Sequence, residues 1–71
     1  MEVRTEITAN VWQVRVEVGQ RVEVGTELVV LESMKMEIPV EATVAGTVTE
    51  IRVRPDQQIA EGDVVAVIDE G

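Results

Sequence analysis

Lys35 is the residue of this chain whose type and position best suggest a specific chemical modification. It is the only lysine among 71 residues, and all the other positive side chains are arginines. A lysine amine can be acylated to an amide, whereas a guanidinium in practice cannot. Met34 and Met36 flank it, and apart from Met1 they are the only methionines. The chain therefore offers a single side-chain amine, in a distinctive setting, to an acylating enzyme.

The residue types that the chain lacks exclude most catalytic chemistry. It has no cysteine, so it can form neither a disulfide nor a thiolate metal site. It has no histidine, which removes the commonest metal ligand, the commonest general base and any Ser-His or Cys-His nucleophile pair. No glycine-rich loop opens a helix, as a phosphate-binding loop requires. We therefore predict no catalytic residue and no metal site, and a protein that is acted upon by enzymes.

The charge of the chain argues against nucleic acid as a partner. Fourteen acidic and six basic residues give a net charge of −8, and such a surface repels phosphate backbones. Trp12 is the one aromatic residue, so there is no platform for stacking bases or sugars. We expect Trp12 in mid-strand or near the termini, away from Lys35, with no role in the chemistry.

The start of the chain carries no sign of targeting. Residues 1–4, Met-Glu-Val-Arg, do not resemble a signal peptide. No apolar run approaches the length that a membrane span needs. We therefore expect a cytoplasmic protein that does not contact a membrane.

Apolar and polar residues alternate along the chain with the period of a β-strand. Residues 14–18 and 48–53 are two such runs, and valine and isoleucine dominate them, as strands prefer. No stretch has a convincing helical period. Turn signals separate the short runs. Four glycines are expected to act as backbone devices at these turns, through positive φ or close approach, namely Gly19, Gly25, Gly46 and Gly62.

The chain also repeats itself with an offset of 37 residues, the separation of Val11 from Val48. Identical residues at this offset include the pairs Arg15 and Arg52, Val16 and Val53, Gln20 and Gln57, Gly25 and Gly62, and Val30 and Val67. Neither unit of this length can bury its apolar face alone, so the two must pack together with approximate two-fold symmetry. The repeat predicts one all-β domain, a flattened barrel or sandwich of two small antiparallel sheets.

The same repeat predicts where Lys35 lies. The position 37 residues before or after Lys35 falls outside the chain. Lys35 is therefore in the connection between the two units, and its symmetric counterpart is the region of the chain ends. We expect residues 28–32 to enter a hairpin and residues 36–40 to leave it. The lysine at the hairpin tip and the two termini should occupy opposite poles of the domain.

Residues 32–37, Glu-Ser-Met-Lys-Met-Glu, resemble the attachment motif of biotin carboxyl carrier proteins, in which methionines flank the modified lysine. The resemblance covers almost the whole chain. It includes Val16-Glu17-Val18-Gly19 with Val22 and Gly25 in the first unit, and Gly46-Thr47-Val48 with Gly62-Asp63 in the second. Three residues alone are a weak signal, but between two matching β units they are a strong one. Residues 1–71 thus resemble a single biotinyl domain.

The resemblance implies a fold of the biotinyl/lipoyl type, with two four-stranded antiparallel sheets related by a quasi-dyad. It implies that a biotin protein ligase attaches biotin covalently to Lys35. Biotin then takes a carboxyl group at a biotin carboxylase and delivers it at a carboxyltransferase. Met34 and Met36 would belong to the surface that these enzymes recognise. Acetyl-CoA, propionyl-CoA, another acyl-CoA and pyruvate all fit as the carboxyl acceptor of such a carrier.

The chain departs from the family pattern in three places. Residues 7–10, Ile-Thr-Ala-Asn, lack the Pro/Gly turn often seen before the first long strand, and Ser33 stands where alanine is common. The connection after Val16 is short, so the chain resembles members without the protruding thumb that can hold the biotin ring. Without that loop, we expect the biotin arm to stay mobile in solution.

Two other functions remain open on the sequence. A lipoyl carrier shares the fold, although its lysine usually lies between an acidic and a small residue, where this chain has Met34 and Met36. An unmodified interaction module, such as the biotinyl/lipoyl-like hairpin of membrane-fusion adaptors, is the other. Such modules require helical hairpins or membrane anchors, for which the chain has no pattern.

Overall fold

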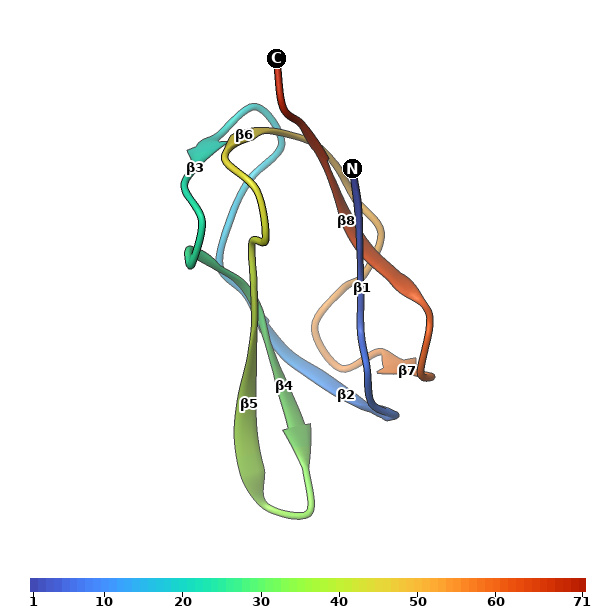
Figure 1. Ribbon diagram of the computed structural model, residues 1–71. Coiled ribbons are helices and arrows are strands. Elements are labelled where there is room, and N and C mark those ends of the chain that lie inside the picture. Colours follow the sequence, from blue (N-terminus) through green and yellow to red (C-terminus); the bar gives the residue numbers. More distant parts are fainter.

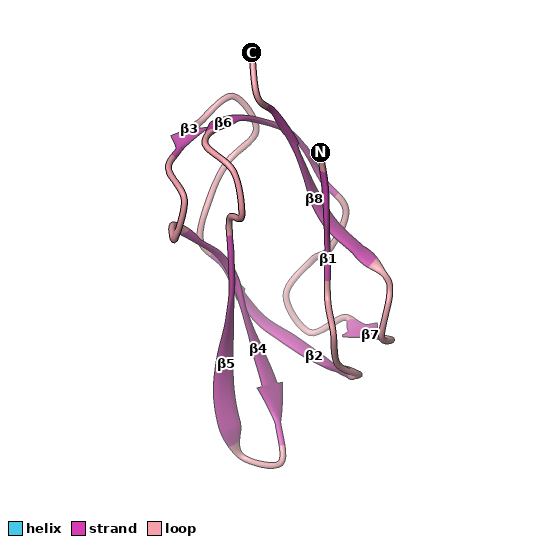
Figure 2. Cartoon of the chain, in the orientation of Figure 1, coloured by secondary structure: helices cyan, strands magenta, loops and turns pink.

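The computed structural model describes all of residues 1–71 and consists of strands, turns and loops (Figure 2). Its eight strands are β1 (Glu2–Arg4), β2 (Ala9–Val14), β3 (Arg21–Val22), β4 (Glu27–Ser33), β5 (Met36–Glu41), β6 (Gly46–Ile51), β7 (Gln58–Ile59) and β8 (Val64–Asp69). The all-β prediction is therefore confirmed, but the strand predicted at residues 14–18 is wrong, because β2 ends at Val14 and the chain then turns toward β3. No helix is present that could cross a membrane.

The strands form two four-stranded sheets with the orders β1-β8-β6-β3 and β5-β4-β2-β7. Every strand pair is antiparallel. The sheets pack face to face around one core of 15 buried residues, most of them valine, leucine and isoleucine. Leu28, Leu31, Val48 and Ile68 are fully buried in it. This is the flattened sandwich that the alternating pattern predicts.

The quasi-two-fold symmetry is exact enough to be followed in single hydrogen bonds. Each strand of the first unit, β1 to β4, has its counterpart four strands later, in β5 to β8. Exchanging counterparts converts the order β1-β8-β6-β3 of one sheet into the order β5-β4-β2-β7 of the other. The Gly25 N–H donates to the Ala42 carbonyl at 2.9 Å, and the Gly62 N–H donates to the Thr5 carbonyl at 2.9 Å. Gly25 and Gly62 both have positive φ, 93° and 91°. Each glycine therefore fixes one unit to the other at an equivalent point.

The repeated glutamines close equivalent turns. The Gln20 side-chain oxygen accepts a hydrogen bond from the Glu17 N–H at 3.1 Å, and that of Gln57 accepts from the Arg54 N–H at 3.0 Å. The residue before each glutamine has positive φ, 93° at Gly19 and 69° at Asp56. Glycine adopts this conformation without a steric penalty, whereas aspartate does not. The second unit thus carries a small local strain that the first unit avoids.

Replacing Asp56 by glycine should therefore stabilise the domain by about 0.5–1 kcal/mol, since the relief of strain exceeds the added flexibility of the unfolded chain. The reciprocal change, Gly19→Asp, should destabilise it by about 1 kcal/mol or more, because its φ lies further from the left-handed region that aspartate tolerates. Urea unfolding of both variants measures the difference. Equal stability of the two variants would contradict this assignment of strain.

Gly46 differs from the other three glycines. It was expected at a turn, but it lies at the start of β6, opposite Val22 on β3. Its φ is not among the positive values. A Cβ atom there would overlap the Asp69 carbonyl oxygen and lie 2.8 Å from the Ile68 side chain. Close approach of β8 to β6, rather than turn geometry, requires glycine at this position.

The long axis of the domain separates the chain ends from the β4–β5 hairpin. The molecule measures 36 × 17 × 17 Å. Both termini lie at one end and the hairpin projects from the other (Figure 1). The Met1 ammonium group donates a hydrogen bond to the Ile68 carbonyl at 2.7 Å, which anchors the N-terminus at that end. The opposite poles that the repeat predicts are therefore present in the structure.

Candidate functional site

The hairpin that carries Lys35 ends in a two-residue turn. Ser33 on β4 pairs with Met36 on β5, so that Met34 and Lys35 are the only residues between them. Their φ values are 52° and 64°. Two successive positive φ values are typical of the type I′ turn, whose twist matches the twist of antiparallel strands. The tight turn places Lys35 at the extreme tip of the molecule.

The side chains at the tip are largely exposed to solvent. Lys35 is exposed, and the Met34 and Met36 side chains are 92% and 63% exposed. None of the four ion pairs involves Lys35. An amine in this position is accessible from most directions. It can enter the active site of another protein without any rearrangement of its own domain.

The strands beneath the tip hold it rigidly. β4 lies between β5 and β2 in its sheet. Leu31, four residues before Lys35, pairs with Ile38 on one side and Val11 on the other, and it is fully buried. Burial of a leucine side chain contributes about 1.5–3 kcal/mol. The hairpin is therefore a rigid mount for the lysine.

Negative charge surrounds the base of the tip. Glu32 on β4 lies directly opposite Glu37 on β5, one pair below Ser33 and Met36. Like charges directly opposite each other destabilise a strand pair. The shortest ion pairs lie on the other sheet, where Arg4 binds Glu2 and Arg52 binds Glu50, each at 2.7 Å. The Lys35 ammonium is therefore a cation at the end of an acidic hairpin.

The ion pairs on the other sheet engage two of the arginines. The hydrogen bond with Glu50, together with the charge of the same carboxylate and of Glu2, raises the pKa of Arg52 above its ordinary value. Arg4 also donates to the Gly62 carbonyl at 2.8 Å. These side chains stabilise the sheet that does not carry the tip.

The geometry of an exposed lysine between methionines, on a hairpin between two β units, agrees with the comparison with known families. The family described as "Biotin-requiring enzyme", the biotin/lipoyl family, matches residues 2–68. The chain belongs to this family. Its members carry a carrier domain of this kind, which is not itself catalytic, so this protein is a carrier domain and not an enzyme.

Two small relatives match nearly along their whole length. A protein of Mycobacterium leprae named "Biotinylated protein TB7.3 homolog" is 51% identical over 67 residues, which cover 94% of each chain. The "Biotin/lipoyl attachment protein" of Bacillus subtilis is 42% identical over 65 residues, covering 92% of this chain and 89% of its own. The chain is therefore similar to proteins that consist of little more than this domain.

Solved structures of large carboxylases contain a closely similar domain. The urea carboxylase of Kluyveromyces lactis matches with a TM-score of 0.92 and 35% identity over 97% of this chain. A single-chain, multi-domain long-chain acyl-CoA carboxylase matches with a TM-score of 0.85 and 32% identity over 93%. This chain spans only 6% of the length of each. The likeness supports the biotinyl fold and relates the domain to carboxylases.

The exposed methionines of this biotinyl/lipoyl domain do not fill gaps in its core. Methionine is often used in proteins as an adaptable packing residue. Met34 is almost fully exposed, so its side chain stabilises nothing in the isolated domain. An apolar side chain held at such a position beside Lys35 suits contact with a second protein. The prediction that Met34 and Met36 belong to a recognised surface is consistent with this geometry.

Trp12 lies in the middle of β2, where the register with β4 shifts between Val11 and Gln13. Such an irregularity is typical of a β-bulge, which turns a side chain out of the regular alternation. The Trp12 side chain is 40% exposed. As the only aromatic residue, it is a natural fluorescence reporter for unfolding of the domain.

The amine at the tip is suited to covalent attachment of biotin. An amide bond to the biotin carboxyl group requires one accessible primary amine, and Lys35 is the only side chain that has one. The Met1 amine is at the other pole and is engaged with the Ile68 carbonyl. No other side chain of the domain can form the same linkage.

Proposed function

We propose that Lys35 is the covalent attachment site for biotin, that a biotin protein ligase modifies it, and that the domain carries a carboxyl group between a biotin carboxylase and a carboxyltransferase in the cytoplasm. The observation that carries this proposal is the position of the only lysine, exposed at the tip of a rigid hairpin in a biotin-requiring family. Met34 and Met36 form the adjoining surface that the partner enzymes recognise.

The chemistry of attachment has to come largely from the ligase. A lysine ammonium in water is almost fully protonated at neutral pH and is then not nucleophilic. The domain has no histidine or cysteine to remove this proton. The ligase must therefore supply both an activated acyl group and the base. A domain that supplies only the amine, while the ligase supplies the activated acyl group and the base, acts as a substrate of the ligase.

The rigid hairpin then serves transfer between two active sites. When bound, biotin supplies a ureido nitrogen that receives a carboxyl group at one active site and releases it at another. The domain holds the attachment point in a fixed exposed position, and the flexible arm supplies the remaining reach. Tethering makes each delivery effectively intramolecular, with local concentrations of order millimolar for short flexible linkages.

The carboxyl acceptor is expected to be chosen by the carboxyltransferase. The two similar carboxylases act on different substrates, urea and long-chain acyl-CoA, by their names. Both nevertheless contain a domain at least 32% identical to this one. A carrier of this type thus suits several acceptors, including acyl-CoA esters and pyruvate.

Incubation of the purified protein with a biotin protein ligase, biotin and ATP should convert it to a single product with one added biotin, measured by intact mass. Acylation replaces an ammonium by a neutral amide, so the net charge changes from −8 by one further negative unit. The product should therefore migrate further toward the anode on a native gel. Unchanged mass after incubation would refute the proposal.

Binding to avidin distinguishes biotinylation from lipoylation, and it also allows partner proteins to be purified together with this domain. Lipoylation of the same lysine remains a candidate, because one relative is named a biotin/lipoyl attachment protein. Protein isolated from its native cells should bind avidin if it carries biotin, and should fail to bind if it carries lipoate. Proteins that co-purify on avidin under mild conditions should include a carboxylase and a carboxyltransferase.

A further inference from the structure

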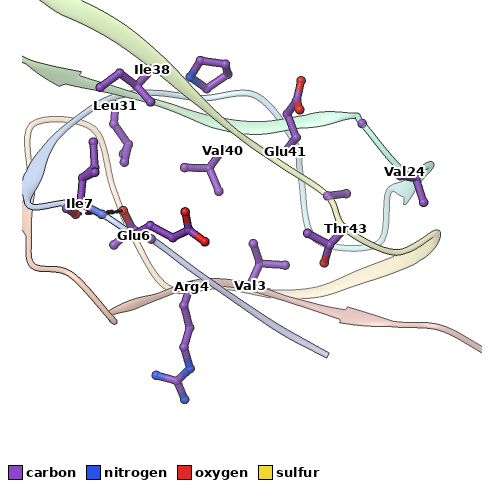
Figure 3. Close-up of a pocket in the computed structure, with 14 residues that line it drawn as sticks. Val3, Arg4, Glu6, Ile7, Val24, Leu31, Ile38, Val40, Glu41 and Thr43 are labelled. Carbon is purple, nitrogen blue, oxygen red and sulfur yellow. Dashed lines mark hydrogen bonds between the residues drawn. The ribbon is translucent and has the colours of Figure 1, made fainter.

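A groove of about 540 Å³ runs between β1 and β5, the edge strands of the two sheets (Figure 3). β1 pairs only with β8 and β5 only with β4, so no backbone hydrogen bonds close this side of the sandwich. We call it the edge groove. The residues used below to define it are Glu6, Ile7, Leu31, Ile38 and Val40.

The inner surface of the edge groove is apolar. Leu31 is fully buried at its base, and Ile7, Ile38 and Val40 are partly buried around it. In Figure 3 the Ile7 and Val40 side chains point into the space between the two strands. Partly buried aliphatic groups of this kind can bury more of their surface against an apolar ligand.

The exposed Glu6 carboxylate lies at the rim of this lining, and no ion pair engages it. The Glu6 carboxylate extends into the groove below Val40 (Figure 3). The ion pairs of the domain use Glu2, Glu27 and Glu50, and none uses Glu6. The neighbouring Arg4 side chain points away from the groove, toward Glu2 and the Gly62 carbonyl. The groove thus suits a ligand with an apolar body and N–H donors.

The end of the edge groove is within reach of an arm on Lys35. Ile38 is three residues along β5 from Lys35, which is roughly 10 Å at about 3.3 Å per residue. A biotinylated lysine has roughly eleven bonds between its Cα atom and the bicyclic ring, an extended length of roughly 14 Å. An arm folded back along β5 therefore brings the ring to the groove between Ile7 and Ile38.

We propose that the biotin ring of modified Lys35 docks in the edge groove. The two ureido N–H groups donate to the Glu6 carboxylate, and the sulfur-containing ring packs on Ile7, Ile38 and Val40. This inference rests on Lys35 as the attachment site. It differs from the mobile arm that the short connection after Val16 predicts, because the groove is built from residues 6–7 and 38–40, which no local pattern brings together.

The test compares backbone amide spectra of the unmodified protein and of protein acylated on Lys35. One sample carries biotin and a second carries a plain valeryl group, both attached with amine-reactive esters. Lys35 is the only side-chain amine, so no ligase is needed. Both esters also acylate the Met1 amine, so Lys35→Arg treated with the biotin ester, which is modified at Met1 alone, supplies the control for that group.

The valeryl group should shift amides only within residues 33–37. Biotin should in addition shift the amides of Glu6, Ile7 and Val40, and its ring protons should show nuclear Overhauser contacts to the Ile7 and Val40 methyl groups. Biotin shifts confined to residues 33–37, with no such contacts, would overturn docking and leave the arm mobile. Failure of the ligase reaction would refute only the proposed function, since the chemically attached ring docks or does not dock independently.

Glu6→Ala tests the hydrogen bond, and Glu70→Ala is its matched control. Both residues are exposed glutamates, so both variants should fold, which their own spectra verify. The biotin-dependent shifts at Ile7 and Val40 should fall at least threefold in Glu6→Ala and stay unchanged in Glu70→Ala. Equal shifts in the two variants would overturn the assignment of Glu6 as the acceptor.

Discussion

The Lys35→Arg variant should incorporate no biotin at all in the ligase reaction. Arginine keeps the positive charge at the tip, but its guanidinium cannot be acylated in practice. The turn should persist, because Lys35 contributes only its backbone conformation and no ion pair to the fold. Intact mass and avidin blotting measure the loss, and circular dichroism verifies that the variant is folded.

A double variant makes this test specific to the hairpin tip. Lys35→Arg combined with Arg54→Lys keeps one lysine in the chain but moves it to another exposed position. The ligase should leave this variant unmodified as well, because recognition requires the amine between Met34 and Met36 on the projecting hairpin. Incorporation at residue 54 would show that the ligase accepts any exposed amine of this domain.

Gly46→Ala should cost about 3 kcal/mol or more of the free energy of unfolding, the upper part of the range for overpacking. The added methyl group would meet the Asp69 backbone, which cannot move without separating β8 from β6, and the Ile68 side chain at 2.8 Å. Domains of this size have little stability in reserve, about 5 kcal/mol in many cases. The variant should retain only about 2 kcal/mol and unfold at a much lower urea concentration than the unmodified chain.

Gly62→Ala is the matched control for this steric effect. Gly62 has a φ of 91°, and a Cβ atom there would meet nothing within 4 Å. Its substitution should cost only about 1 kcal/mol, from the unfavourable backbone conformation alone. Urea unfolding followed by Trp12 fluorescence measures both variants. A Gly62→Ala variant less stable than Gly46→Ala would contradict the close approach of β6 and β8 as the dominant constraint.

The location of Lys35 could be predicted because it follows from two patterns in the sequence. One is the alternation of apolar and polar residues, and the other is the repeat with a constant offset. Alternation of valine with polar residues specifies strands, since side chains alternate between the faces of a sheet. The offset between Val11 and Val48 specifies two equivalent units, and only the connection between them can hold Lys35. The β4–β5 hairpin and the termini at the opposite pole follow from these patterns alone.

The conformation of the turn itself was not predictable from the residue types. Type I′ turns favour Asn-Gly and similar pairs, which reach positive φ at little cost. Met34 and Lys35 are not such residues, yet both have positive φ. The length of the connection between the paired Ser33 and Met36 imposes this conformation. The pairing of β4 with β5 therefore imposes a backbone conformation that Met34 and Lys35 do not favour by themselves.

Positions that are equivalent in the repeat have different steric requirements in the folded domain, because their surroundings differ. Gly46 corresponds to Ala9 in the repeat, so the sequence alone predicts that alanine is acceptable at either position. The close approach of β8 makes glycine necessary at one of them. Likewise Gly19 and Asp56 occupy equivalent turns with positive φ, although only one of them is glycine.

The sequence by itself determined the all-β class, the two-fold repeat and the exposed position of Lys35, because each depends on local alternation or on a constant spacing, although the alternating residues 15–18 form no strand. Only the tertiary structure decided which unpaired edges face each other. The edge groove brings Glu6 and Ile7, in the connection between β1 and β2, next to Ile38 and Val40 on β5. That contact depends on how the sheets pack, and packing is a property of the whole core rather than of any segment.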